Sequence, residues 1–435
     1  MKIIRACVVA ASLLTSTSFG QDLPSDIPAK LAPAEESFDF IKRDVTIPMR
    51  DGVKLHTVIL LPKRLTHAPM LLTRTPYGAS KAASGADSTH LESVVPWGDD
   101  IVAVSGYIRV YQDVRGKYGS EGSYVMNRPL RGPLNNSATD HSTDTYDTID
   151  WLVKNVPESN GRVGIIGTSY GGFLALMALV DPHPALKVAV PIAPMVDVWR
   201  GDDWFHNGAF RQIYALDYTY EQTATRRSDE TLWRSKFDDY DTFLEAGSAS
   251  EIGRRSGEDQ LPFWRRLTQH PAYDSYWQQQ AVDRILAGRP LLVPTLYIHG
   301  QWDQEDIYGA PATYAATEPK DKGNDRNFFV IGPWRHGGSN GDGSTLGPLQ
   351  FGQDTALWFR RNVLQPFLDH YLKDEGLKDD GKPANTPPVL AFETGSNTWH
   401  RYNYWPQSCE SGCAAPLKPL YLAAGGGLSF EPPAG

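Results

Sequence analysis

The stretch Gly167-Thr168-Ser169-Tyr170-Gly171, followed directly by Gly172, joins two segments of different character. Residues 162–166 before it are apolar and partly β-branched, which is typical of a central strand in a parallel sheet. Residues 173–180 after it are apolar and rich in Ala and Leu, which predicts a helix packed on that sheet. A G-x-S-x-G motif between a strand and a helix indicates a nucleophile elbow, so Ser169 is the predicted nucleophile. A glycine-rich turn with an incidental serine is the alternative.

Segments on both sides of the motif alternate between strand and helix patterns. Residues 37–48 and 53–62 alternate apolar and polar side chains around Arg50-Asp51-Gly52, which predicts a β-hairpin. Further strands are expected at residues 70–75, 107–113, 186–192, 291–299 and 327–331, and helices at 143–155 and 355–375, the latter kinked at Pro366. This alternation predicts an α/β fold with a doubly wound sheet.

The pattern changes twice along the 435 residues. Between residues 199 and 286 Trp, Tyr, Arg and Gln crowd helical stretches, so we expect a helical insertion that caps the sheet. After residue 375 the chain is Pro-rich and β-like, with strand patterns at 389–393 and 417–422. The predicted divisions are a signal peptide (1–20), a first core segment (21–198), a helical cap (199–286), a second core segment (287–375) and a C-terminal β segment (376–435).

Composition and the first residues narrow the classes of function. The chain is 41% apolar and 21% charged, as globular proteins are, and its net charge of −9 argues against nucleic acid and anionic membranes as partners. Lys2 and Arg5 precede an apolar stretch at residues 6–14, and small residues follow at Ser18-Phe19-Gly20, which predicts a signal peptide cleaved after Gly20. The apolar stretch is too short to span a bilayer, so we expect a periplasmic or secreted protein.

Two cysteines remain after the expected cleavage, Cys409 and Cys413. In an oxidising compartment their short spacing predicts a local disulfide. A metal site would need further Cys or His close by in the sequence, so no metal is expected.

A serine nucleophile needs a base, and the base needs an acid to orient it. His336 follows a predicted strand in a loop with glycines behind it, which is where the base is expected. Asp303 lies soonest after the strand that ends near residue 299, with Glu305 and Asp306 as the rival acids. The resulting order of Ser169, acid and histidine is that of α/β-hydrolases.

An oxyanion hole needs two donors directed at the developing negative charge. The backbone N–H of Tyr170, directly after the nucleophile, is one of them by construction. The second donor is expected in a loop after an early strand, and the Tyr77 hydroxyl in the loop at residues 72–78 is a candidate.

With these segments and Asp113-Val114-Arg115-Gly116, the chain resembles serine hydrolases that include X-prolyl dipeptidyl peptidases, cocaine esterase and glutaryl acylases. Within that group it is most similar to the α-amino acid ester hydrolases, on the evidence of Gly201-Asp202-Asp203-Trp204-Phe205-His206 and Trp302-Asp303-Gln304-Glu305-Asp306. The resemblance spans roughly residues 38–425. It implies an α/β-hydrolase core with a helical cap and a C-terminal jelly roll. The implied site is a triad of Ser169, Asp303 and His336 with an oxyanion hole made by the Tyr77 hydroxyl and the Tyr170 amide.

The resemblance also implies that Asp203, Glu305 and Asp306 bind the substrate's α-ammonium group. Crowded carboxylates raise one another's pKa, and a cation among them relieves the repulsion and gains charge-assisted hydrogen bonds. An α-amino ester carries such a cation beside the scissile carbonyl, so binding there would position the acyl carbon over Ser169. Solvated surface acids are the alternative. For Asp140, Asp144, Asp147 and Asp150, which recur at helical spacing, a solvated helix face is the favoured interpretation.

The implied function is a hydrolase and acyltransferase that cleaves or forms esters and amides of α-amino acids, β-lactam antibiotic side chains included, through an acyl-enzyme. It implies no cofactor and a homo-oligomer. The alternatives are a related esterase, acylase or dipeptidyl peptidase without a strict α-amino requirement, and a catalytically inactive binding protein. Two features depart from the subgroup: Gly171 stands where glutamate is expected, and the chain ends after the opening strands of the jelly roll, as a truncated product would.

Overall fold

The computed structural model describes residues 25–31, 38–63, 65–234, 236–374, 386–409 and 415–433. The predicted signal peptide, the domain boundary at residue 376 and the predicted disulfide lie outside the described residues, because Cys413 and the side chain of Cys409 are not among them. Residues 38–435 form one compact unit.

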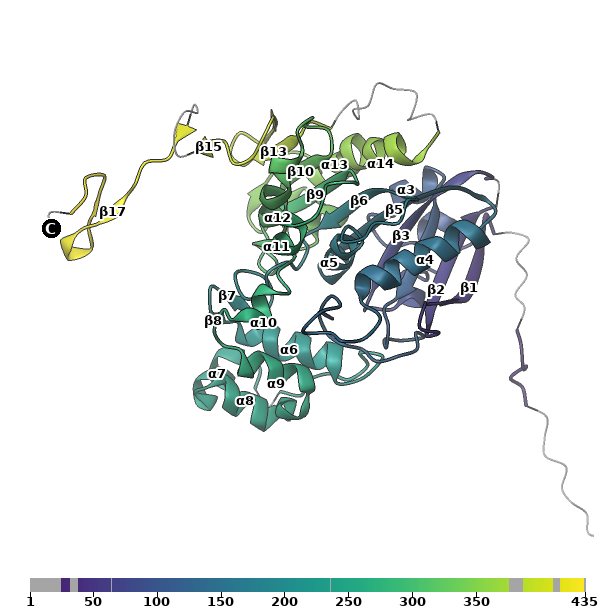
Figure 1. Cartoon of the computed structure of the whole chain (residues 1–435), viewed down its shortest axis with the longest axis horizontal. Helices are drawn as coiled ribbons and strands as arrows, with labels where there is room; N and C mark the ends of the chain where they lie inside the picture. The colour runs from purple at the N-terminus through teal and green to yellow at the C-terminus, as the bar shows by residue number, and fades with distance from the viewer. Residues whose placement is uncertain are drawn as a thin grey trace, which may run out of the picture. The chain divides into compact units, whose positions relative to one another are not determined.

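A ten-stranded sheet with the order β1-β2-β4-β3-β5-β6-β9-β10-β13-β14 organises this unit (Figure 1). The strands from β4 to β13 in this order run parallel, and β1, β2 and β14 pair antiparallel at the edges. The strands are β1 (Phe40–Pro48), β2 (Lys54–Pro62), β3 (Ala68–Thr75), β4 (Ile108–Asp113), β5 (Ser159–Thr168), β6 (Leu186–Ile192), β9 (Thr295–Trp302), β10 (Asn327–Arg335), β13 (Val389–Glu393) and β14 (Thr398–Tyr402). The predicted α/β fold is confirmed.

Helices cover both faces of the sheet because its central strands are apolar on both sides. On β9, Leu296 and Ile298 pack into the core on one face and Tyr297 into the core on the other, as the two-residue period of a strand requires. Helices α4, α5, α11 and α12 contribute to the first core, and α3, α13 and α14 to the second. Their bounds are α3 (Asp100–Val104), α4 (His141–Asn155), α5 (Tyr170–Met177), α11 (Val282–Ala287), α12 (Gly309–Thr317), α13 (Thr355–Phe359) and α14 (Gln365–Leu372). A π-helical turn at residues 360–364 precedes Pro366 and joins α13 to α14 where the kink was predicted.

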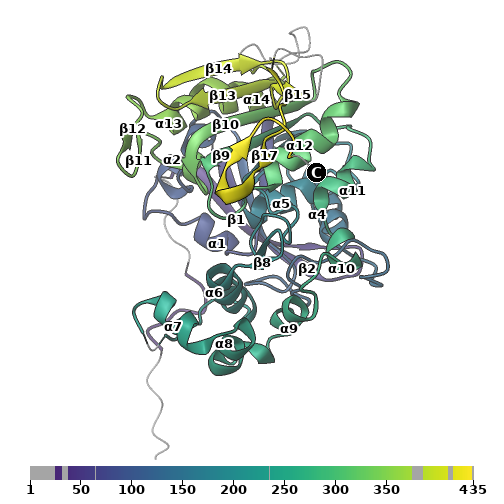
Figure 2. The same cartoon turned by 90° about the vertical axis from the view of Figure 1, so that its left-hand side faces the viewer.

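The segment predicted as a helical insertion is mostly helical, and α6 to α9 gather into one group in Figures 1 and 2. It contains β7 (Phe205–His206), β8 (Ala209–Phe210), α6 (Gln212–Thr223), α7 (Asp239–Ala246), α8 (Ala249–Ser256), α9 (Pro262–Gln269) and α10 (Ser275–Gln278). Aromatic side chains hold it together: the ring centroids of Trp204 and Phe263 lie 5.1 Å apart. The core anchors it through Lys117, whose Nζ donates to the carbonyl oxygen of Gln222 at 3.0 Å. The two short helices α1 (Ala79–Ala82) and α2 (Leu91–Val94) complete the described core before β4.

The first two strands of the C-terminal segment join the core sheet. The strand predicted at 389–393 is present as β13, but it pairs parallel with β10, and β14 then pairs with β13. Residues 389–402 therefore extend the core sheet, and Leu390 shares an apolar core with the α13 and α14 helices. The short strands after them are β15 (Ser408–Cys409), β16 (Ala415–Pro416), β17 (Tyr421–Leu422) and β18 (Leu428–Ser429).

The acids of α4 are a second correction. Asp144 is fully buried, with its Oδ1 at 2.7 Å from the Arg115 guanidinium. Asp140 caps the helix by accepting from the backbone N–H of Thr143 at 2.8 Å. Asp147 pairs with Arg50 at 2.7 Å. The predicted solvated face is wrong for Asp140 and Asp144, because Asp140 is buried as the cap of its own helix and Asp144 is covered by the distant Arg115.

Candidate active site

Ser169 lies at the turn between β5 and α5 with φ 61° and ψ −122°, a conformation that side chains other than glycine rarely adopt. The turn has no room for side chains at two of its glycines. A Cβ at Gly167 would lie 2.3 Å from the carbonyl oxygen of Gly171, and a Cβ at Gly172 would lie 2.7 Å from that of Ile192. The backbone strain at Ser169 costs about 1–3 kcal/mol. It persists because the surrounding packing holds the turn, as in nucleophile elbows.

Gly171 differs from its neighbours in the turn. A Cβ there would meet only the carbonyl oxygen of Arg74, at an ordinary contact distance of 3.6 Å. Gly171 also lines the cavity that contains Ser169. The glycine at this position is therefore not required by the elbow, and a side chain at 171 would enter the cavity.

His336 and Asp303 meet at the ends of β10 and β9. His336 Nδ1 lies 3.0 Å from Asp303 Oδ2 and 3.1 Å from Oδ1. Asp303 Oδ1 also accepts from the backbone N–H groups of Glu305 at 2.8 Å and Asp306 at 2.9 Å. Burial raises the pKa of Asp303, but the hydrogen bond from His336 outweighs it and the net pKa is lowered. Burial lowers the pKa of His336, but Asp303 and then Glu305 outweigh it and the net pKa is raised.

The Ser169 hydroxyl is directed at an acid. Its Oγ donates to Asp306 Oδ2 at 3.4 Å, and among the residues that the structure describes no hydrogen bond joins Ser169 to His336. His336 Nε2 lies 3.4 Å from Glu305 Oε2. The hydroxyl and the imidazole thus each contact one carboxylate of the predicted ammonium-binding group.

The carboxylates of Asp203, Glu305 and Asp306, here called the acid cluster, are crowded and poorly paired. Asp203 is 3% exposed and Asp306 0%. One oxygen of each, Asp203 Oδ2 and Asp306 Oδ1, has no hydrogen-bond partner within the described ranges. Burial raises the pKa of Asp203 to about 7, and Glu305 and Asp303 add to that rise. Burial, followed by repulsion from Asp203, raises the pKa of Asp306 well above its usual value.

The two predicted oxyanion donors lie beside the nucleophile. Tyr77 is half-buried, and its hydroxyl is 2.8 Å from that of Tyr218 on α6. Burial raises the pKa of Tyr77, against the effect of hydrogen bonds with Tyr218 and Ser169. Tyr170 is the first residue of α5, where a helix leaves its N–H groups without intrahelical acceptors. Both groups are therefore able to donate near Ser169.

Two further residues organise the site and were missed in the sequence. Asp202 is buried and accepts four backbone N–H groups: those of residues 196 and 197 at 2.9 and 3.0 Å, and those of residues 308 and 309 at 3.0 Å each. Arg211 donates to the carbonyl oxygens of Gln304 and, at 2.8 Å, Glu305. Together they tie the start of the insertion to the loop that carries the acids. Local sequence held no signal for either, because an Asp-Asp pair and a lone Arg fit many surface positions.

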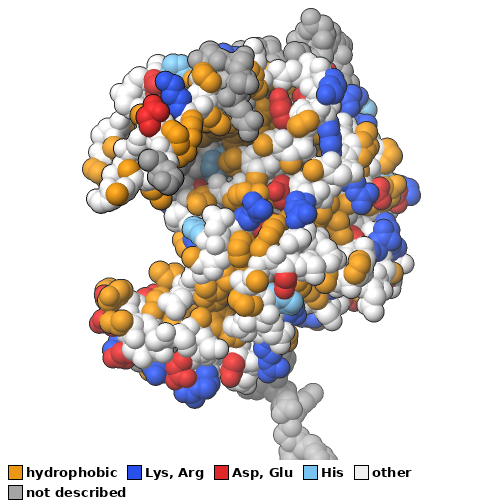
Figure 3. Space-filling view, turned by 60° about the vertical axis from the view of Figure 1, so that its left-hand side comes forward, with side chains coloured by type: hydrophobic (Ala, Val, Ile, Leu, Met, Phe, Trp, Pro, Cys, Tyr) orange, Lys and Arg blue, Asp and Glu red, His pale blue; other side chains and the backbone are white. Residues whose placement is uncertain are grey.

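The cavity around the nucleophile holds about 410 Å³. Its walls include Ser169, His336, Tyr77, Glu305 and Trp97. Figure 3 shows one face of the molecule, which is hollowed and carries hydrophobic and histidine side chains in and around the hollow. Within the described residues no group of three or more His, Cys, Asp or Glu has the arrangement of a metal site, and no helix is long and apolar enough to cross a membrane.

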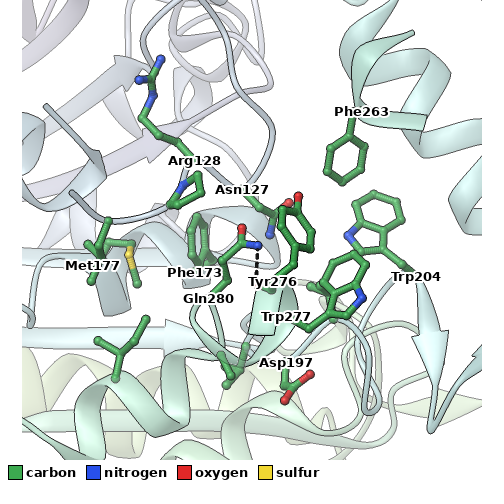
Figure 4. Close-up of a pocket in the computed structure, with 16 residues that line it drawn as sticks. Asn127, Arg128, Phe173, Met177, Asp197, Trp204, Phe263, Tyr276, Trp277 and Gln280 are labelled. Carbon is green, nitrogen blue, oxygen red and sulfur yellow. Dashed lines mark hydrogen bonds between the residues drawn. The ribbon is translucent and has the colours of Figure 1, made fainter. Parts of the chain in front are cut away.

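A second, aromatic cavity lies between α5 and the insertion (Figure 4). Trp204, Trp277 and Phe263 lie together on one side of it in Figure 4, and Phe173 and Met177 lie on the other. It holds only about 20 Å³, close to the space of one water, and Ser169 is not among its lining residues in the described chain. The larger cavity is therefore the one suited to chemistry.

Comparisons with known proteins agree with this geometry. The model of the family described as X-Pro dipeptidyl-peptidase (S15 family) matches residues 51–338. The solved structure of an α-amino acid ester hydrolase is 55% identical, with a TM-score of 0.88, over 98% of this chain and 67% of that chain. An aminopeptidase from the marine sediment archaeon Thaumarchaeota archaeon is 53% identical, with a TM-score of 0.87, over 96% of this chain and 66% of that one.

Cocaine esterase of Rhodococcus sp. (strain MB1 Bresler) is 26% identical over 384 residues, which cover 84% of this chain and 60% of the esterase. The chain thus spans about 60% of the length of this curated relative. The family match includes the elbow, the Asp303 loop and His336, and it confirms the resemblance predicted from the sequence. The chain belongs to the X-Pro dipeptidyl-peptidase (S15) family of hydrolases.

Proposed function

We propose that the chain is a serine hydrolase and acyltransferase that acts on esters and amides of α-amino acids through an acyl-enzyme. The observation that carries the proposal is the acid cluster: Asp203 and Asp306 are buried, and each has one carboxyl oxygen without a partner among the described residues. The other oxygen of Asp306 lies 3.4 Å from the Ser169 hydroxyl. A substrate ammonium group would pair with these oxygens, which would relieve the repulsion that raises their pKa. The similarity to an α-amino acid ester hydrolase at 55% identity supports the same substrate class.

Substrate binding would also activate the nucleophile. In the free protein the Ser169 hydroxyl donates to Asp306, so its proton is directed away from the base. An ammonium group on Asp306 would compete for that oxygen and release the hydroxyl to His336 Nε2. The proposed trigger is thus the same group that positions the acyl carbon.

The remaining steps would follow from the positions of the other side chains. His336 would take the proton from Ser169 as the bond to the acyl carbon forms, with Asp303 orienting the imidazole. The Tyr77 hydroxyl and the Tyr170 N–H would stabilise the oxyanion. Water, or an amine for synthesis, would then resolve the acyl-enzyme. We extend the proposal to β-lactam antibiotic side chains as acyl groups, to a homo-oligomer and to a periplasmic or secreted location.

Hydrolysis of phenylglycine methyl ester and of its des-amino analogue, phenylacetic acid methyl ester, tests the proposal. Charge-assisted hydrogen bonds contribute about 1.5–3 kcal/mol, so kcat/KM for the amino ester is expected to be about 10- to 100-fold higher. Equal values for the two esters would favour the alternative, an esterase or acylase with no α-amino requirement, for which the similarity to cocaine esterase is the supporting observation. Failure of a fluorophosphonate probe to label Ser169 would instead favour an inactive binding protein.

A further inference from the structure

The cavity at Ser169 extends away from the acid cluster. Ser169, His336 and Tyr77 line it, and of the cluster only Glu305 does so in the described chain. This inference rests on the proposed function: if the ammonium group lies among the acids, the leaving group must occupy this cavity. The residues that line the cavity away from the acid cluster therefore determine which leaving groups and acceptor amines fit.

Trp97 is the main side chain in that part of the cavity. It is 79% exposed, and it lines both the cavity at Ser169 and a neighbouring cavity that also holds about 410 Å³. Asn340 lines both cavities too. The two loops touch, since a Cβ at Gly98 would lie 3.0 Å from Asn340 Cβ. Asn340 is fixed in turn by its Nδ2, which donates to Thr168 Oγ1 at 2.9 Å. An exposed aromatic face thus stands on the path from the nucleophile to the neighbouring cavity.

The neighbouring cavity contains a cation, Arg335, whose charge lowers the pKa of Glu305 against the larger effect of burial but which makes no hydrogen bond or ion pair among the described residues. Arg335, the last residue of β10 and directly before His336, lines this cavity and is exposed. The acid of the same cavity, Asp342, accepts instead from Ser344 N at 2.8 Å. The guanidinium is therefore available to an anion from solution.

The charges of the first cavity differ. Asp99 on its wall pairs with the Arg109 guanidinium at 2.6 Å and accepts a hydrogen bond from the Tyr111 hydroxyl at 2.7 Å. Glu305 lies within 3.4 Å of His336 and disfavours a second carboxylate beside the nucleophile. An anionic leaving group would thus place its charge toward Arg335 rather than near Ser169.

We propose that Trp97 and Arg335 form a subsite for the leaving group, selective for an amino acid with an apolar side chain and a free carboxylate. The apolar side chain would lie on the Trp97 face, and the guanidinium would bind the carboxylate through parallel N–H···O bonds. During cleavage the Ser169 Oγ–acyl bond forms and the amide C–N bond breaks. The proton held by His336 passes to the leaving nitrogen, which departs as a neutral amine. The same subsite would bind an acceptor amino acid in the reverse direction.

The test compares phenylglycyl-phenylalanine with phenylglycyl-phenylalaninamide, which differ only in the carboxylate. For the unaltered protein we expect kcat/KM to be about fivefold higher for phenylglycyl-phenylalanine than for its amide, because an exposed ion pair contributes up to about 1 kcal/mol. Arg335→Gln is expected to lower the ratio to about 1 through KM, and Arg335→Lys to restore part of it. Arg361→Gln, an exposed arginine of the same type outside both cavities, is the matched control and should keep the ratio of the unaltered protein.

A ratio that is the same in the unaltered protein and in Arg335→Gln would overturn the subsite. A ratio that falls equally in Arg361→Gln would also overturn it, since the effect would then come from net charge. The amino and des-amino methyl esters separate this outcome from failure of the proposed function. Neither ester carries a carboxylate on its leaving group, so loss of α-amino selectivity there concerns the acid cluster alone.

Discussion

Two groups of acidic side chains are buried in this protein, and they differ in whether the fold supplies partners for their carboxylates. On α4, Asp144 is 0% exposed and is paired with Arg115 at 2.7 Å, with Arg74 at 3.8 Å. In the acid cluster, Asp306 is also 0% exposed, yet one of its oxygens has no partner among the described residues. In the first arrangement the buried carboxylate is paired with cations of the fold itself. The second leaves carboxyl oxygens without partners among the described residues and raises the pKa of Asp203 and Asp306, and an added cation would favour their ionised form. We therefore assign binding to the cluster and stability to α4.

The largest expected effect breaks the paired group. Asp144→Asn would remove the buried counter-ion of Arg74 and leave Arg115 with the exposed Asp51 alone, so we expect it to lower the free energy of unfolding by about 3–5 kcal/mol. The isosteric change Asp306→Asn removes a charge from a crowded site and should leave that free energy unchanged or raise it. Denaturant unfolding of the two variants measures both. Equal destabilisation by the two substitutions would show that the fold depends on Asp306 as much as on Asp144, which would contradict the distinction between them.

Gly167 and Gly171 lie in the same turn but differ in the space around them: a side chain at Gly167 would clash, and one at Gly171 would not. Gly167→Ala would place a methyl group 2.3 Å from a backbone oxygen, so we expect about 1–3 kcal/mol of destabilisation and a large loss of activity. Gly171→Ala, with its nearest contact at 3.6 Å, should keep the stability of the unaltered protein within about 0.5 kcal/mol. Thermal unfolding checks both, and a matched loss in the two variants would contradict the geometry of the elbow.

Substitution of Arg211 tests whether the acid cluster must be held in place to select the amino ester. This guanidinium holds the acid loop through two carbonyl oxygens and lowers the pKa of Asp203 and Glu305 against the larger effect of burial. Arg211→Gln should therefore reduce kcat/KM for the amino ester by about fivefold, a loss of about 1 kcal/mol, and affect the des-amino ester less. A general disturbance of the loop would instead slow both esters equally.

The pH dependence gives the smallest expected effect. The base must be neutral to act, and the pKa of His336 is raised from 6.5, since Asp303 and Glu305 outweigh the opposing effect of burial. Activity on the des-amino ester should therefore fall as the pH drops, with a midpoint above 6.5. Glu305→Gln removes a negative charge that raises the pKa of His336, so it should move the midpoint to lower pH. A rate that stays flat to about pH 4 would exclude His336 as the base.

The sequence predicted the parts of the fold that local patterns control. The strand, turn and helix around Ser169 carry their own period and glycines, and the first hairpin has an alternating pattern on both sides of its turn. The place of β13 could not be predicted in this way, because pairing with β10 depends on a partner about sixty residues earlier. Its apolar residues fit a core strand and a separate β domain equally well.

The site shows the same division. Ser169, Asp303 and His336 each follow a strand, so the edge where parallel strands end predicted their meeting, and the resemblance supplied the acid cluster. Burial of Asp144 was not predictable from α4, because the residue that neutralises it, Arg115, lies outside the helix. Asp202 and Arg211 were missed for a related reason: their partners are backbone groups of distant loops, which leave no mark on side-chain patterns.

The central claim is that an unpaired acid cluster selects substrates by their ammonium group. The most direct measurement is the ratio of kcat/KM for phenylglycine methyl ester to that for its des-amino analogue, in the unaltered protein and in Asp203→Asn. We expect a ratio of about 10 to 100 that drops to within a few-fold of 1 in the variant, because the isosteric amide supplies no charge to bind the ammonium group. A ratio that Asp203→Asn leaves unchanged would contradict the account.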